Sequence, residues 1–147
     1  LRSISSEPLK VYGKMCDKVI IIKVHPALKK EYLETFLSIE DLRGVILETY
    51  GSGNAPTADW FINTVKHTIE RGIVVLNVTQ CKAGSVVMGH YEASRELLNM
   101  GVISGGDITT EAALAKLMFV LGNYDDEQEI REKLQADLRG EVTKSIL

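Results

Sequence analysis

The sequence predicts an α/β fold, in which a parallel sheet of about four strands carries helices on both faces, as in flavodoxin-like or Rossmann-like domains. Short β-branched runs without strict polar alternation are typical of strands buried on both faces. Helical patterns separate these runs, and this alternation favours a three-layer parallel sheet with right-handed crossovers. The 147 residues, 45% of them hydrophobic, are enough for one core and few for two.

The expected strands are four apolar runs, at residues 19–24, 44–50, 72–78 and, more briefly, 101–104. The first expected helix follows Pro26, a residue that suits the first helical turn. The second ends at Gly72, which can stop a helix. The periodic apolar residues of these two helices are Leu28, Tyr32 and Phe36, then Phe61, Val65 and Ile69.

Three further helices are expected in the second half of the chain. One runs through Leu97 and Leu98 to Gly101. In the next, Thr109 is the predicted N-cap, Glu111 stabilises the first turn, and Gly122 is expected just after the end. The last is predicted from the spacing of its apolar residues, Ile130, Leu134 and Leu138.

The domain prediction places a linker, or the end of a preceding domain, at residues 1–17 and one domain at residues 18–147. The polar opening without an initiator Met indicates that residue 1 lies inside a longer protein. A net charge of −3 with interspersed signs indicates neither nucleic acid nor an anionic membrane as partner, and no apolar stretch approaches a membrane span. Cys16 and Cys81 lack metal-ligand spacing, which favours reduced thiols in the cytoplasm.

The second expected strand is followed by a glycine pair, in the stretch VILETYGSGNAP of residues 45–56. A dinucleotide site is one interpretation, but Pro56 stands where the third glycine belongs, and the next strand ends in NVT without an acid for a ribose. The alternative is structural. Gly51 and Gly53 would adopt positive φ in a tight turn, and Asn54 would cap the following helix.

The loop TQCKAGSVVMGHY, residues 79–91, is longer than a crossover requires, which is frequent in functional loops. Cys81 and His90 could form a nucleophile and base, yet no sequence feature orients the imidazole or activates the thiol. A packed, inert Cys81 is the alternative. The sequence predicts no metal site and no cofactor.

Four ordered blocks resemble one family: VILETYGSGNAPT, RGIVVLNVTQCKAGSVVMGHYEAS, GVISGGDITTEAALAKLMFVLG and DLRGEVT. Together they look like the C-terminal domain of cytosolic, type I L-asparaginases. The resemblance implies hydrolysis of L-asparagine to L-aspartate and ammonia, by a nucleophilic Thr and a Thr-Lys-Asp relay in an N-terminal domain. It therefore implies no catalytic residue in this chain. It also implies homodimers or homotetramers in which this domain completes the neighbouring subunit's active site.

The same resemblance assigns roles to individual residues. Asn54 would bind the substrate's α-amino group or the groups around it, since an amide oxygen accepts from an ammonium without adding charge. Tyr91 would enter the partner's site, or alternatively pack on the core at a helix start. Thr79 and Cys81 match an effector site of some bacterial members.

That effector site also uses an arginine at the position of Glu48, where an acid cannot clamp a carboxylate. The sequence therefore predicts no effector response. A different class of function stays open beside the enzyme. The chain would then be a stand-alone small-molecule-binding or regulatory α/β module.

Overall fold

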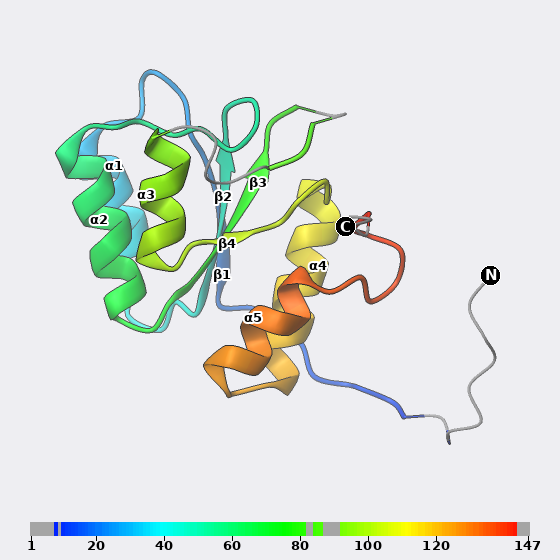
Figure 1. The fold of residues 1–147 in the computed structure, drawn as a ribbon. Helices are drawn as coiled ribbons and strands as arrows, with labels where there is room; N and C mark the ends of the chain where they lie inside the picture. Colours follow the sequence, from blue (N-terminus) through cyan, green and yellow to red (C-terminus); the bar gives the residue numbers. More distant parts are fainter. Residues whose placement is uncertain (1–7, 9, 82–83, 87–91, 144–147) are drawn as a thin grey trace.

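The computed structural model describes residues 8, 10–81, 84–86 and 92–143. Four strands form one sheet: β1 (Val19–Lys23), β2 (Gly44–Thr49), β3 (Val74–Thr79) and β4 (Ile103–Ser104). The five described helices are α1 (Lys30–Leu37), α2 (Asp59–Glu70), α3 (Glu92–Met100), α4 (Thr110–Asn123) and α5 (Glu127–Gln135). The three-layer α/β prediction is confirmed, with α1, α2 and α3 on one face of the sheet and α4 and α5 on the other (Figure 1).

The strands are parallel and lie in the order β1-β2-β3-β4. Because each strand pairs with the one before it in sequence, right-handed crossovers place the three connecting helices on one face. After β4 the chain passes to the other face, where α4 packs back across β3, β2 and β1. Because the strands are parallel, their carboxyl ends all lie at the same end of the sheet, at the top of Figure 1. The loops that follow the strands therefore begin there.

Two apolar cores lie on either side of the sheet, and the central strands supply both. In β2, Val45 and Leu47 join the core under α1 to α3, whereas Ile46 joins the core under α4 and α5. This alternation follows from the two-residue period of a strand. β2 and β3 are thus buried on both faces, but Ile21 of the edge strand β1 is exposed.

Several local predictions were wrong. α1 begins at Lys30 and buries Leu33 and Leu37, while Tyr32 and Phe36 lie on its exposed side. Leu138 lies beyond the end of α5.

The N-cap prediction is confirmed, because the Thr109 side chain accepts a hydrogen bond from the N–H of Ala112.

Gly122 lies inside α4, not after its end as predicted. The reason is a chain crossing that the local pattern does not contain. The backbone at Lys14 and Met15 passes so close that a Cβ on Gly122 would meet the Lys14 carbonyl oxygen at 2.8 Å. The N–H of Cys16 then donates to the Met118 carbonyl, and the Asn123 amide donates to the Lys14 carbonyl.

The residues after α5 fold back onto α4 through a buried ion pair. Lys116 and Glu141 lie 2.8 Å apart, with only 3% and 13% of their side chains exposed. The Lys116 ammonium also donates to the Ala136 carbonyl, and the Glu141 carboxylate accepts from the N–H groups of Leu138 and Arg139. Within the described part of the chain, no helix has the length and apolarity needed to cross a membrane.

Candidate functional site

Three loops meet at the carboxyl ends of the strands, where parallel α/β sheets carry their sites. They are the turn at residues 50–54 after β2, the described residues 79–81 and 84–86 from the last residue of β3 onward, and residues 104–106 from the last residue of β4 onward. Val86 joins the last two, because its N–H donates to the Gly106 carbonyl and its own carbonyl accepts from the Ser104 hydroxyl. The Thr79 hydroxyl donates to the Gly51 carbonyl of the first loop, so the three loops form one connected surface.

The turn after β2 closes on itself. Tyr50 and Asn54 exchange two backbone hydrogen bonds of 2.8 Å, and the N–H of Gly53 also donates to the Tyr50 carbonyl. Gly51 and Gly53 have φ of 48° and 105°, so the prediction of positive φ at both is confirmed. The structural alternative was wrong about Asn54, however. The N-cap residue of α2 is Ala58, so Asn54 does not cap this helix.

The side chain of Asn54 is left with an unused acceptor. Its Oδ1 atom is buried and has no hydrogen-bond partner among the described residues. A buried, unpaired polar atom costs about 1 to 3 kcal/mol, a cost that a ligand donor would remove. An N–H of an ammonium or amide matches this oxygen, because an amide oxygen only accepts.

A buried polar cluster from β2 and β3 supports this turn. Asn77, which is fully buried, accepts a 2.6 Å hydrogen bond from the Thr49 hydroxyl and donates from Nδ2 to the Gly53 carbonyl. Sequence reasoning missed both Asn77 and Thr49. The available signal was polar residues inside runs that are otherwise buried and apolar, since such groups require partners.

Thr79 and Cys81, the candidates for an effector site, lie beside this turn. The Thr79 hydroxyl donates to the Gly51 carbonyl and accepts from the N–H of Cys81, so it is already engaged within the protein. Cys81 is an exposed free thiol. Tyr91 and His90 lie outside the described residues, so their predicted roles stay predictions.

Glu48, at the end of β2, has two polar neighbours that its local sequence does not suggest. The carboxylate accepts from the Thr110 hydroxyl at the start of α4 and lies 3.9 Å from the Lys23 ammonium. Lys23 is its register partner on β1. The Glu48 side chain is 16% exposed and that of Lys23 62%, so a cation lies next to the acid at the surface.

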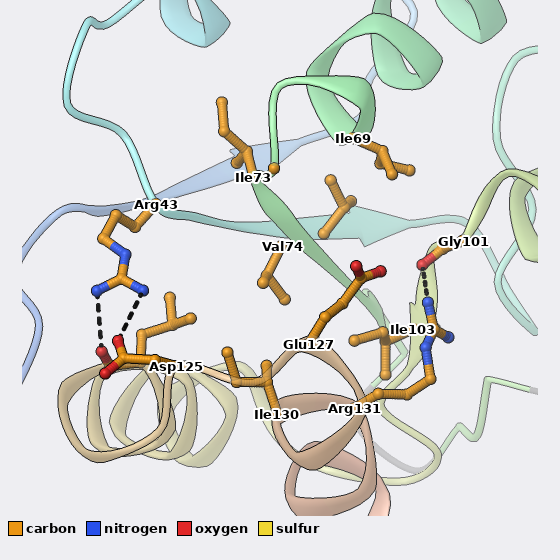
Figure 2. A pocket seen from close by; sticks show the side chains of 13 residues that line it. Arg43, Ile69, Ile73, Val74, Gly101, Ile103, Asp125, Glu127, Ile130 and Arg131 are labelled. Carbon is orange, nitrogen blue, oxygen red and sulfur yellow. Dashed lines mark hydrogen bonds and ion pairs between the residues drawn. The ribbon is translucent and has the colours of Figure 1, made fainter.

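A cavity of about 270 Å³ opens at the opposite end of the strands, by the amino ends of β2 and β3 (Figure 2). Its two arginines already have partners. Arg43 lies 3.8 Å from Asp125 and donates to the Leu121 carbonyl, and Arg131 donates to the Gly101 carbonyl. No group of three or more His, Cys, Asp or Glu among the described residues could hold a metal. The carboxyl-end loops, with their unused acceptor, are therefore the better candidate site.

Residues 18–134 match the sequence model of the Glutaminase/Asparaginase C-terminal domain. The chain belongs to this family. L-asparaginase 1 of Escherichia coli K12 is 38% identical to this family member over 123 residues, which are 84% of the chain and 36% of that protein. The human 60 kDa lysophospholipase is 40% identical over 136 residues, which are 92% of the chain and 23% of that protein.

Solved structures agree with the family assignment. The crystal structure of L-asparaginase I from Vibrio cholerae superposes with a TM-score of 0.87 at 39% identity, over 95% of this asparaginase-type domain and 42% of that chain. The thermostable L-asparaginase from Thermococcus kodakarensis gives a TM-score of 0.82 at 33% identity, over 97% of the domain and 44% of that chain. The chain thus spans about a quarter to under half of these relatives.

Proposed function

We propose that this chain is the C-terminal domain of an L-asparaginase that hydrolyses L-asparagine to L-aspartate and ammonia, and that it closes the active site of a neighbouring subunit. The nucleophilic Thr belongs, in this proposal, to a preceding domain of the same protein. One observation carries the proposal: the Oδ1 of Asn54 at the carboxyl ends of the strands is buried and has no partner in the part of the chain that the structure describes. It offers the acceptor that the α-ammonium of an amino acid requires.

Relatives support this proposal over a stand-alone binding module, because the four named above carry enzyme names and three of them are L-asparaginases. Assembly into homodimers or homotetramers is part of the proposal. Exposed apolar side chains favour it, since Tyr32, Phe36 and Ile39 at α1 and Ile21 on β1 are 43 to 52% exposed. The free thiols of Cys16 and Cys81 fit the cytoplasmic location that we propose.

Removing the Asn54 side chain tests the proposal in the full-length protein. We expect Asn54→Ala to lower kcat/KM for L-asparagine by about 5- to 150-fold, which corresponds to about 1 to 3 kcal/mol for a lost hydrogen bond to a charged group. Ammonia release measured over a range of asparagine concentrations gives both kcat and KM. Tyr91→Phe should lower kcat/KM as well, in keeping with its predicted role.

Asn63→Ala is the matched control, because Asn63 is exposed on α2. It should leave both constants unchanged. A full-length protein that releases no ammonia from asparagine would contradict the proposed function, and equal kinetics in the Asn54 and Asn63 variants would remove Asn54 from the site.

Glu48 leads us to expect simple saturation by asparagine, without cooperativity. An effector carboxylate placed beside Glu48 would meet an acid whose neighbouring cation, Lys23, is already paired with it. The rate should therefore rise hyperbolically with asparagine, and titration calorimetry should find one asparagine bound per subunit. A Hill coefficient clearly above one that disappears in Lys23→Met would show instead that Lys23 clamps an effector.

A further inference from the structure

We propose that Asn77 is a positioning residue, which holds the turn of residues 50–54 so that the Asn54 side chain meets its ligand in one orientation. This inference rests on the proposed function, because the ligand is the amino acid of that site. Neither Asn77 nor its partner Thr49 is expected to touch the substrate. Both act on the turn that carries Asn54.

The first argument is the set of contacts that Asn77 makes. Its Oδ1 accepts from the Thr49 hydroxyl at 2.6 Å, which orients the amide so that Nδ2 faces the turn. Nδ2 then donates to the Gly53 carbonyl at 3.3 Å. Thr49 and Asn77 belong to neighbouring strands, so the rigid centre of the sheet fixes one side of this bridge. The peptide that leads from Gly53 into Asn54 is fixed at the other side.

The second argument is the lack of space around Gly53. A Cβ there would lie 2.8 Å from Val86 and 3.2 Å from the Asn77 amide nitrogen. Gly53 is thus held between the Asn77 side chain and Val86 of the next loop. The Asn77 backbone also accepts from the N–H of Gly105 after β4. Asn77 therefore contacts the turn after β2 and the loop after β4. Val86, which belongs to the loop after β3, contacts both of these as well.

The third argument is energetic. Asn77 is fully buried, and a buried amide in a strand is retained at a cost unless its polar atoms are paired. Its partners here belong to the turn and to the strand beside it, and not to an opposing helix. A small displacement of such a supporting group moves the side chain that binds the ligand. Binding weakens as a result, because a binding group must lie within about 0.5 Å of its proper position.

Thr49→Val tests the inference in the full-length protein. The change keeps the side-chain shape but removes the hydroxyl that orients Asn77. We expect KM for asparagine to rise about 3- to 10-fold while kcat stays within about twofold. We also expect amide hydrogen exchange at Gly53 and Asn54, whose N–H groups bond to Tyr50, to become at least about tenfold faster. Thr49→Ser keeps the hydroxyl and should restore both readouts.

Thr68→Val is the matched control. Thr68 is also buried, but its hydroxyl donates only within α2, to the Thr64 carbonyl. It should lower stability without changing KM or exchange in the turn. Asn77→Ala is a second test. It should raise KM and speed amide exchange in the turn more than Thr49→Val does. If the Asn77→Ala protein does not fold, Thr49→Val alone decides.

Exchange at Gly53 and Asn54 that is the same in Thr49→Val and Thr68→Val would overturn the inference. So would faster exchange with an unchanged KM, because the turn would then not govern binding. If the unchanged protein does not hydrolyse asparagine, the proposed function fails, and the exchange measurement still decides whether Asn77 holds the turn.

Discussion

Replacing Glu141 by alanine is expected to lower the free energy of unfolding by about 3 to 5 kcal/mol, the usual cost of breaking a buried ion pair from one side. Lys116 would lose its partner in a site where only 3% of its side chain is exposed. It would retain the Ala136 carbonyl as an acceptor but no counter-charge. The N–H groups of Leu138 and Arg139 would lose their acceptor as well. Urea unfolding at pH 7 measures the effect.

The same pair makes stability depend on pH. Burial raises the pKa of Glu141, but hydrogen bonds from Lys116 and from the backbone of Leu138 and Arg139 outweigh it and hold the pKa at about 2, below the usual 4.5. A carboxyl group with a depressed pKa stabilises the fold above its unfolded pKa. That contribution, about 3 kcal/mol, declines as the pH falls from about 4.5 and is lost below about 2.

Two variants separate this pair from an ordinary surface pair. Glu70→Ala removes an exposed partner of Lys66 on α2 and should change stability by less than about 1 kcal/mol. Replacing both Lys116→Met and Glu141→Leu should recover most of the loss and flatten the acid limb of the stability profile. A Glu141→Ala protein as stable as Glu70→Ala would show that water screens the Lys116 site.

The chain of residues 1–147, purified by itself, is expected to release no ammonia from L-asparagine. Amide hydrolysis through a covalent intermediate needs a nucleophile next to a base. In the described part of the site, the hydroxyls of Thr49 and Thr79 donate to amide or backbone oxygens, and Cys81 is a free thiol at the surface. The proposed function places the nucleophile in the preceding domain, and positioning groups alone do not replace it.

The Thr110 hydroxyl, at the start of α4, does bond to a carboxylate, that of Glu48. Among the hydroxyls of Thr49, Thr79 and Thr110, that of Thr110 is therefore the one to test as a nucleophile. Turnover by the purified chain that disappears in Thr110→Val would show a nucleophile within it and would contradict our division of the site. The control is the full-length protein, which should release ammonia under the same conditions.

Patterns of neighbouring residues predicted most of the fold. The β-branched runs gave the strands, because burial on both faces leaves a continuous apolar sequence. The positive φ of Gly51 and Gly53 also followed from local chemistry. The predictions failed where distant residues decide. Gly122 looks like a helix stop, yet it is a glycine because the Lys14 backbone crosses α4 there.

The site was less predictable for the same reason. Asn54 was identified through resemblance, but its unused Oδ1 depends on how the turn closes. Asn77 lies 24 residues from Gly53 in sequence, and no local pattern joins the two. Likewise, the cation beside Glu48 comes from the register of β1 against β2, which places Lys23 opposite it. Such cross-strand neighbours require the three-dimensional fold.

The sequential strand order also has a consequence for synthesis on the ribosome. Each strand pairs with the one made just before it, about 25 to 30 residues earlier, so β1 to β4 and the helices α1 to α3 can assemble as the chain emerges. The other face of the sheet, with Ile46 and Leu76, stays uncovered until α4 and α5 leave the exit tunnel. We therefore expect nascent chains from which residues beyond 110 have not yet emerged to bind chaperones through this face, and chains from which residue 141 has left the tunnel to be released.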